Sequence, residues 1–391
     1  MEYTEVTSYL HNISNDYKPA ILHICLSTGC GGLEMYPSRV GGQFLQKGYC
    51  VFGLASKNSR VAKFMKNAGM NVFTVKNKFQ LFGPKLFELT RWLQKNKIKI
   101  IHSHKSGDIL ISMLLSLFTT RFSVFTEHIG VKHSKKDVYH RLVYRHINQV
   151  LSVSNETYQR NMNTLPVSKT NIQCLWLGTH IDARDISTPS INHKLKSELN
   201  LSKDTMLIGT VGRICKGKGQ SELLTAFELI ADEYPNAHLI LIGGLLEDEG
   251  ADVGFSLILQ SQAVASAHTA RIHFVGYRLD VSELLDEIQI VCLPYYNEAF
   301  GLTAIEAMSQ RCAIVAANTG ALPEILGDTG VYCDPQSSLS IAIGLKQYLS
   351  MPALIHKNAT NGYLRVTKHF SMQGHVDKLE SIYLNGVAQL V

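Results

Sequence analysis

The sequence of 391 residues lacks any apolar run of the roughly 18 residues that a membrane-spanning helix needs. Its longest candidate, residues 109–118, contains serines, and we expect it to form a core helix. Residues 1–18 are polar and contain no apolar segment of the kind found in secretory signals. We therefore expect a cytoplasmic protein.

Closely spaced cysteine pairs are missing as well. The eight cysteines form no Cys-x-x-Cys pair, and most of them lie in apolar, strand-like segments. This distribution predicts reduced thiols and argues against a disulfide or zinc framework.

Several ligand motifs are incomplete. A glycine-rich turn, Gly29-Cys30-Gly31-Gly32, follows the first apolar run, but Glu34 stands where a dinucleotide fingerprint needs its third glycine. The turn is therefore suited either to a substrate approaching the backbone at Gly31 and Gly32 or simply to a tight strand-to-helix connection. No Walker A order and no Asp-x-Asp metal motif are present.

Acidic residues are scarce in the first half of the chain. Residues 1–180 hold 23 Lys/Arg and 9 Asp/Glu, a charge of +14, whereas residues 181–391 hold 15 and 23, a charge of −8. The basic half is suited to an anionic membrane face or a phosphorylated acceptor, although an ordinary basic domain is equally compatible with the count. No nucleic-acid motif accompanies the charge, so we expect no nucleic-acid partner.

What the sequence does contain is a regular alternation of apolar runs and helical stretches. The first series of runs comprises 20–26, 50–54, 71–75, 98–102, 123–126, 150–153 and 172–176. The second comprises 206–212, 238–243, 271–276, 288–294, 312–316 and 331–334. Helical stretches such as 83–95 and 135–148 lie between the runs, and the polar segment 178–204 reads as a linker. The pattern predicts an α/β protein with two doubly wound parallel sheets.

Histidines follow two of these runs. His102 and His104 alternate along a strand and should lie on one face. Such a pair is able to hold a metal, but no third ligand is evident, so a polar acceptor pocket or a satisfied core pair is favoured. His128 ends the next run and is expected to face a ligand.

Two glutamates separated by seven residues follow the apolar run 288–294, one in a loop and one in the helix that comes after it. The start of that helix offers unpaired N–H groups and partial positive charge, which suit a phosphate, and Gly301 allows close backbone approach. Glu298 and Glu306 would accept hydrogen bonds from hydroxyl groups on either side of that phosphate. The arrangement fits a nucleotide sugar, the alternative being two solvated charges.

A second candidate phosphate site follows the run 206–212. It contains Gly212-Arg213 and Lys218-Gly219, in which arginine makes forked contacts and lysine supplies a point charge.

With these motifs the chain, from about residue 19 to 385, resembles the retaining group 1 glycosyltransferases of family 4. The Glu298–Glu306 spacing and the Arg213–Lys218 spacing are the most specific features. Another is Gly320-Ala321-Leu322-Pro323-Glu324, in which Ala321 replaces the usual glycine.

The resemblance implies the GT-B fold, with two Rossmann-like domains facing across a cleft. Residues 1–180 would form the acceptor-side domain, with 370–391 packing back onto it, and 181–369 would form the donor-binding domain.

The resemblance also implies roles for single residues. Arg213 and Lys218 would bind the donor diphosphate, Glu306 the ribose hydroxyls and Glu298 the transferred sugar. His128 would lie over that sugar, and His102 and His104 would lie on the acceptor side. Further donor contacts would be Gly31, Gly32, Gly212, Gly276, Tyr277, Phe300, Gly301, Leu302 and Thr303.

The implied reaction moves a sugar from a nucleotide-diphosphate sugar to a hydroxyl of a saccharide or lipid-linked acceptor, with retained configuration and with neither cofactor nor metal. It would belong to bacterial lipopolysaccharide or other surface glycan synthesis, at the inner face of the plasma membrane. A nucleotide-sugar epimerase or phosphorylase, or a non-catalytic nucleotide-sugar-binding scaffold, is the alternative.

Overall fold

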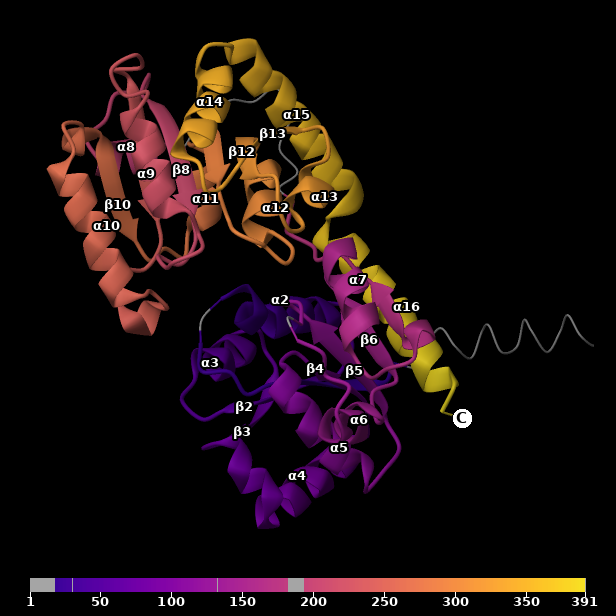
Figure 1. Cartoon of the computed structure of the whole chain (residues 1–391). Helices are drawn as coiled ribbons and strands as arrows, with labels where there is room; N and C mark the ends of the chain where they lie inside the picture. The colour runs from indigo at the N-terminus through magenta and orange to yellow at the C-terminus, as the bar shows by residue number, and fades with distance from the viewer. Residues whose placement is uncertain (1–17, 30, 132, 182–192, 391) are drawn as a thin grey trace, which may run out of the picture. The chain divides into compact units, whose positions relative to one another are not determined.

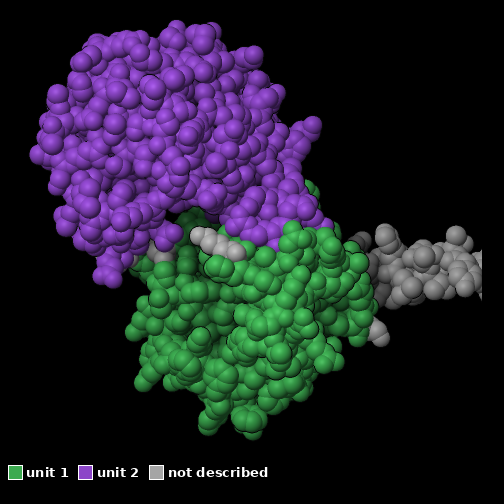
Figure 2. Space-filling model, in the orientation of Figure 1, with its two compact units in different colours: residues 1–151, 161–173, 376–391 green, residues 152–160, 174–375 purple. Residues whose placement is uncertain are grey.

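The computed structural model describes residues 18–29, 31–131, 133–181 and 193–390, and Figure 1 shows the order of its elements. The chain separates into two compact units, which Figure 2 distinguishes by colour. Unit 1 comprises Met1–Leu151, Asn161–Gln173 and Val376–Val391, whereas unit 2 comprises Ser152–Arg160 and Cys174–His375. Residues 182–192 of the predicted linker and residues 1–17 lie outside the described part of the chain.

Unit 1 is built around a seven-stranded sheet with the order β3-β2-β1-β4-β5-β6-β7. Its strands are β1 Ala20–Cys25, β2 Val51–Ser56, β3 Asn71–Val75, β4 Ile98–Ser103, β5 Phe122–Glu127, β6 Gln149–Ser152 and β7 Ile172–Cys174. The central strands pair in parallel and are buried along their length, as expected for apolar strands covered on both faces by helices.

Helices and short 3₁₀ turns connect these strands. They are α2 Gly32–Gln46, α3 Arg60–Asn67, η1 Lys78–Phe82, α4 Pro84–Lys95, η2 Ser106–Asp108, α5 Ile109–Ser116, α6 Val138–Tyr144, α7 Asn155–Thr164, η3 Lys169–Asn171 and, from the end of the chain, α16 Met372–Ala388. The boundaries between the two units fall inside or beside α7, β6, β7 and α16. Helix α5 is the core helix predicted for residues 109–118, and its buried side chains pack with those of the sheet.

Helix α6 is shorter than the predicted stretch of residues 135–148. Its start is fixed by Asp137, whose carboxylate accepts a hydrogen bond from the backbone N–H of His140. Lys135 instead donates its N–H to the carbonyl of Thr164, a contact outside any helix. The local cap therefore overrides the longer helical pattern.

Unit 2 contains a six-stranded parallel sheet with the order β10-β9-β8-β11-β12-β13. Its strands are β8 Met206–Val211, β9 Ala237–Ile242, β10 Ile272–Gly276, β11 Ile290–Leu293, β12 Ala313–Ala317 and β13 Gly330–Cys333. The connecting elements are α8 Lys194–Glu198, α9 Gln220–Glu228, η4 Glu247–Glu249, α10 Val253–Ala265, η5 Thr269–Arg271, α11 Val281–Leu285, α12 Leu302–Ser309, α13 Leu322–Leu326, α14 Ser338–Leu349 and α15 Pro352–His369.

From residue 376 onward, α16 is fastened to the sheet of unit 1. Lys47 forms an ion pair with Asp377 at 2.7 Å, and the Tyr49 hydroxyl donates to Glu380 at 2.7 Å. Nearer the end of α16, Gly386 lies so close to the ring of Phe122 that a Cβ would stand 2.1 Å from it. The last helix is thus part of the core of unit 1.

The two parallel, doubly wound sheets confirm the predicted fold class. Cys25, Cys292, Cys312 and Cys333 are buried free thiols. Among the described helices, none combines the length and apolar character that crossing a bilayer requires.

Candidate active site

Most of the predicted donor residues of unit 2 lie near the point where the strand order of its sheet reverses. Strand β8 pairs with β9 on one side and with β11 on the other. The connection after β8 leads to β9, and the connection after β11 leads to β12 in the opposite direction. The loop 212–219 follows β8, and the loop 294–301 follows β11. In open α/β sheets, ligands bind outside the carboxyl ends of the strands at such a switch point.

Lys218 and Glu298 meet between these two loops. The Lys218 Nζ lies 2.7 Å from the Glu298 Oε2 and 4.0 Å from the centre of the Tyr295 ring. Tyr295 is buried, and its hydroxyl donates to the carbonyl of Val211 at the end of β8. Residues 80 positions apart in the sequence are therefore held in contact by an ion pair and by a ring beneath the ammonium.

Backbone contacts fix the two loops to each other. Gly219 has φ +67°, and a Cβ there would stand 2.2 Å from the carbonyl oxygen of Pro294. The backbone N–H of Tyr296 donates to the carbonyl of Gly217 at 2.9 Å. Only glycine allows the approach at residue 219, so the basic loop depends on it for its position.

Arg213 is exposed at the rim of this site. Its carbonyl accepts a hydrogen bond from the side chain of Gln220 at 2.8 Å. Within the described part of the chain, its guanidinium makes no hydrogen bond or ion pair. Arg213 is thus anchored by its backbone while its charged group extends into solvent.

Helix α12 begins at the second of the two loops. Gly301 precedes it with φ +102°, and the N–H groups of Ala304 and Ile305 bond to the carbonyl of Gly301. No side chain caps this start, so the first turn presents its backbone N–H groups in the way that favours an anion. Glu306 lies partly buried in the middle of the helix.

The loop that carries Glu298 is braced by the turn at residues 320–324. Gly320 has φ +63°, and a Cβ there would stand 2.5 Å from the Glu298 carbonyl oxygen. The N–H of Ala321 donates to that same carbonyl at 2.9 Å. Ala321 itself has φ −86°, so alanine fits at the position where the sequence departs from the usual glycine.

Glu324 in the same turn has a structural role that the sequence did not indicate. Its carboxylate accepts hydrogen bonds from the backbone N–H of Asn155 at 2.9 Å and from the indole of Trp176. The Ser154 hydroxyl donates to the carbonyl of Ala299 at 2.7 Å. The start of α7 is thereby tied to both loops around Glu298.

Gly276 and Tyr277 lie at the end of β10, which is the edge strand of the sheet. Gly276 has φ +70°, and its carbonyl accepts from the N–H of Gly243. Tyr277 is partly buried. Two strand positions separate this pair from β8, so within unit 2 it flanks the Lys218–Glu298 contact without joining it.

Unit 1 has its own switch point, between β1 and β4. Gly32 is the first residue of α2, and Gly31 is its N-cap, at the end of the connection that follows β1. Gly31 adopts an extended backbone with φ −165°. Beside them, the Ser27 hydroxyl donates to the Glu34 carboxylate at 2.7 Å. A side chain at Gly31 would approach that carboxylate at 3.1 Å, so the turn is compact.

His102 and His104 do share one face of their strand, and both are fully buried. Their ring centres lie 4.2 Å apart. The His102 Nδ1 lies 2.5 Å from the Tyr383 hydroxyl of α16, and its Nε2 lies 2.7 Å from the Thr126 hydroxyl. Both of its ring nitrogens are thus satisfied inside unit 1.

A third histidine, His23, completes this cluster. Its Nδ1 lies 2.9 Å from the Nε2 of His104, and its Nε2 is buried without a hydrogen-bond partner among the described residues. One ring nitrogen from each of the three histidines lies within 4.8 Å of the others. The sequence held a signal for His23, a polar residue inside the first apolar run, in the register position opposite His102.

His128 extends the cluster toward the surface. Its Nε2 lies 3.5 Å from the Nδ1 of His104, and its ring meets the buried ring of Tyr36 edge-on at 4.9 Å. Since His128 is only partly buried, it is the member of the cluster that is available to a ligand.

Two family models match the chain, one after the other. Residues 30–182 match the model described as Glycosyltransferase Family 4, and residues 192–365 match the model described as Glycosyl transferases group 1. Together they span both units.

The chain belongs to the group 1/family 4 glycosyltransferases. It therefore has the GT-B fold and is a retaining enzyme that takes its sugar from a nucleotide sugar.

Individual relatives of this glycosyltransferase are distant. It is 24% identical over 355 residues to the capsular polysaccharide biosynthesis glycosyltransferase CapM of Staphylococcus aureus, covering 87% of this chain and 91% of CapM. It is 26% identical over 179 residues to the lipopolysaccharide core biosynthesis mannosyltransferase LpcC of Rhizobium leguminosarum, covering 45% and 50% of the two chains. The structure of Anabaena HepE in complex with UDP-glucose aligns with a TM-score of 0.76 at 19% identity, over 93% and 99% of the chains.

Burial sets the charge state of the histidine cluster in this glycosyltransferase. It lowers the pKa of His23 to about 3 and holds the pKa of His104 well below the ordinary value, with neighbouring imidazoles adding to the effect at His104. Both rings are therefore neutral at pH 7. Burial also raises the pKa of Asp108 to about 7, and that carboxyl accepts from the N–H of Leu26.

Proposed function

We propose that this glycosyltransferase transfers its sugar to a hydroxyl of a saccharide or lipid-linked acceptor during the synthesis of lipopolysaccharide or another surface glycan. The named roles of CapM and LpcC in capsule and lipopolysaccharide synthesis support this choice of acceptor class. We further propose a uridine nucleotide as donor, which the UDP-glucose complex of HepE supports. A lipid-linked acceptor would bring the enzyme to the inner face of the plasma membrane.

The contact between Lys218 and Glu298 at the β8–β11 switch point carries the assignment of the donor site. In this proposal Arg213 and Lys218 bind the diphosphate, and the backbone N–H groups from Phe300 to Thr303, at the start of α12, bind the sugar and the distal phosphate. Glu298 then exchanges its bond to Lys218 for hydroxyls of the transferred sugar. Glu306 holds the ribose, with Gly212, Gly276 and Tyr277 as further donor contacts.

The residues proposed from unit 1 complete the reaction. His128 contacts the donor sugar, Gly31 and Gly32 line the acceptor side near the diphosphate, and His102 and His104 belong to the acceptor side. Since His102 and His104 are buried, we propose that they act by positioning His128 and the strand end.

The chemistry that these groups supply is electrostatic. As the bond to the sugar breaks, negative charge grows on the departing diphosphate, and the sugar acquires oxocarbenium character. Arg213, Lys218 and the start of α12 oppose that charge from fixed positions, which is often the largest catalytic term. No covalent nucleophile is assigned, and the departing phosphate oxygen receives the acceptor proton on the same face. No metal is required for this neutralisation.

A thermal-shift assay with a panel of nucleoside diphosphates, with and without EDTA, tests the donor site. At about 100 times its dissociation constant, a ligand adds roughly 2.7 kcal/mol of stability. We expect a shift with UDP that survives EDTA. A shift with another base would correct the donor, and a shift abolished by EDTA would refute the metal-independent site.

Product analysis with the donor so identified tests the acceptor class. Release of nucleoside diphosphate together with a new glycosidic bond on a lipid-linked or saccharide acceptor supports transfer. An altered sugar still attached to its nucleotide would indicate an epimerase, and release of a sugar phosphate would indicate a phosphorylase. Binding without any product would indicate a scaffold.

A further inference from the structure

Exposed aromatic side chains are confined to one part of the described chain. All five of them, Phe79, Phe82, Phe87, Phe118 and Tyr139, belong to unit 1 and lie between residues 79 and 139. Phe79 is 71% exposed and Phe87 is 56% exposed, although buried aromatic rings fill the cores of both units. Exposed phenylalanines in one segment indicate a surface that another apolar phase covers.

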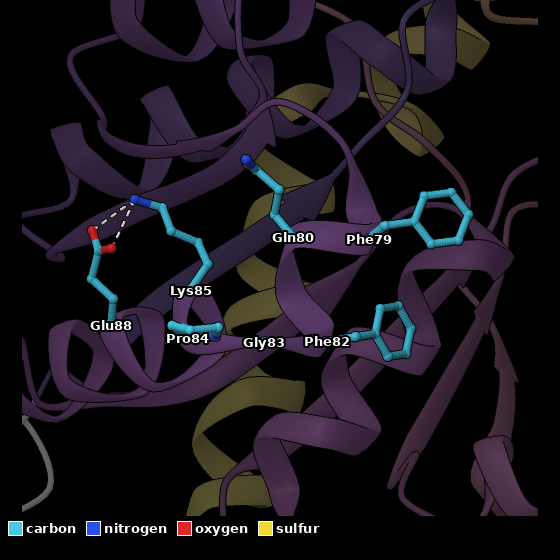
Figure 3. A pocket seen from close by; sticks show the side chains of 7 residues that line it. All are labelled: Phe79, Gln80, Phe82, Gly83, Pro84, Lys85 and Glu88. Atoms are coloured by element: carbon cyan, nitrogen blue, oxygen red, sulfur yellow. Dashed lines mark hydrogen bonds and ion pairs between the residues drawn. The ribbon is translucent and has the colours of Figure 1, made fainter.

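Two of these rings stand on the turn before α4. The ring centres of Phe79 and Phe82 lie 6.4 Å apart, and both rings extend to the same side of the turn (Figure 3). Lys85 and Glu88, which form an ion pair at 2.8 Å, extend to the opposite side. Both sets of side chains, together with Gln80, Gly83 and Pro84, line a pocket of about 510 Å³.

A second pair of exposed rings joins α4 to the residues that follow α5. Phe87, in the first turn of α4, meets Phe118 edge-on at 5.7 Å, and the neighbouring Leu117 is 67% exposed. We call the five exposed side chains Phe79, Phe82, Phe87, Leu117 and Phe118 the aromatic patch.

Helix α6 adds a second exposed apolar face. The Ser116 hydroxyl at the end of α5 lies 2.9 Å from the Nδ1 of His146, which follows α6. Val138, Tyr139 and Leu142 are exposed on α6. Arg141 and Arg145 are exposed beside them.

The charge of the same segment is strongly positive. Residues 76–145 hold fourteen Lys/Arg and four Asp/Glu, a formal charge of +10. Two of the four acids, Asp108 and Glu127, are buried. The other two, Glu88 and Asp137, are paired with Lys85 and His140. Little acidic charge therefore remains to offset the lysines and arginines of this segment, one of which, Lys78, has its Nζ 5.6 Å from the centre of the Phe79 ring.

We propose that the aromatic patch, with α6 and the basic side chains around it, is the face by which this glycosyltransferase docks on an anionic phospholipid bilayer. Phenylalanine rings enter the boundary between headgroups and acyl chains, while lysine and arginine reach the phosphates and stay hydrated. The inference deepens the proposed position of the enzyme at the membrane. It needs no substrate and does not depend on which sugar is transferred.

The rest of the chain differs from this face in both the sign of its charge and the type of its exposed apolar side chains. The other half of the chain, residues 181–391, has a charge of −8, and its exposed apolar residues, such as Leu257 and Ile258 of α10, are aliphatic. That surface lacks both the aromatic and the basic character of the patch. It serves as an internal reference for a surface that should ignore membranes.

Vesicle flotation of the full chain tests the proposal. The vesicles are pure phosphatidylcholine, or phosphatidylcholine with one-third phosphatidylglycerol, at about 0.1 M and about 1 M salt. We expect binding to the phosphatidylglycerol vesicles at low salt and much weaker binding at high salt. The double variant Phe79→Ser/Phe82→Ser should lower the partition coefficient at least about 10-fold, because two rings lose their apolar environment. The matched variant Leu257→Ser/Ile258→Ser should bind as the wild type does.

Two outcomes overturn the proposal. One is equal binding of the wild type and the Phe79/Phe82 variant. The other is a lack of vesicle binding combined with concentration-dependent self-association that the same variant abolishes, which would assign the patch to a second copy. The thermal shift with UDP, measured on every variant, separates this failure from a failure of the donor site, since the patch contains no proposed donor residue.

Discussion

At the scale of single residues, Lys218 is the side chain on which the proposed chemistry most depends. We expect Lys218→Ala to lower the rate of sugar transfer by about 100- to 1,000-fold, because one fixed cation opposite the departing diphosphate is lost. Lys216→Ala is the control, since Lys216 is exposed in the same loop and is given no role. Steady-state release of nucleoside diphosphate measures both, and equal rates for the two variants would contradict the assignment.

His23 predicts a pH dependence of stability. Its pKa is about 3 in the folded chain and returns to about 6.5 on unfolding, so below pH 6.5 the unfolded chain binds a proton that the folded chain does not. The contribution of His23 is therefore fully present above that pH and is lost as the pH falls. Relative to His23→Gln, we expect the wild type to lose about 1.4 kcal/mol per pH unit below pH 6.5.

Urea unfolding of both proteins between about pH 7.5 and pH 5 measures this difference. Comparing the two chains cancels the contribution of other groups, including Asp108, whose raised pKa acts with the opposite sign. A difference between the proteins that stays constant with pH would show that His23 titrates normally when folded.

At the scale of elements, the contact of α16 with the sheet of unit 1 leaves no room at Gly386. A methyl group there would meet the buried ring of Phe122 at 2.1 Å. We therefore expect Gly386→Ala to lower the free energy of unfolding by about 1–3 kcal/mol, as overpacking does.

Gly42→Ala provides a control of opposite sign. Gly42 lies inside α2, and a Cβ there would meet only Ala68 at 3.8 Å, an ordinary contact. Alanine favours a helix over glycine, so we expect this variant to gain about 0.5–1 kcal/mol. Thermal or urea unfolding measures both, and stabilisation by Gly386→Ala would show that α16 is not packed as described.

The strands could be predicted from the sequence because a strand that is buried on both faces consists of a continuous apolar run. The predicted strands 71–75 and 312–316, for example, agree with β3 and β12 to within one residue at each end. The start of helix α6 could not be predicted as well, because it is decided by a single hydrogen bond that the backbone N–H of His140 donates to the cap residue Asp137. The Glu324 contacts also could not be predicted from the sequence, since they join residues more than 140 positions apart.

The donor loops could be anticipated because their motifs lie on consecutive stretches of chain, whereas the histidine cluster depends on register. His23 becomes a neighbour of His104 only once β1 and β4 pair side by side. Periodicity identifies each strand by itself and does not say which strands are adjacent.

At the scale of the whole molecule, the separation into two units predicts where a nucleotide leaves its mark. The proposed diphosphate ligands, Arg213, Lys218 and the start of α12, all belong to unit 2. We expect UDP alone to slow amide hydrogen exchange in residues 212–219 and 296–306, since binding favours the closed forms of these loops. Exchange in strand β4 of unit 1 should not change. Slower exchange in β4 with no change in the two loops would contradict the donor assignment.

The bond between Lys218 and Glu298 also bears on which molecules can replace it. An inorganic phosphate ion that binds the ammonium of Lys218 leaves the carboxylate of Glu298 without a counter-ion, and it adds a second negative charge beside that carboxylate. A free sugar that satisfies the carboxylate leaves the ammonium unmatched. Only a molecule that carries anionic oxygens and hydroxyl groups at the right separation exchanges both partners at once. The ion pair therefore makes binding selective for a molecule that supplies both groups, so the intact donor is favoured over common metabolites that resemble only its phosphate or only its sugar.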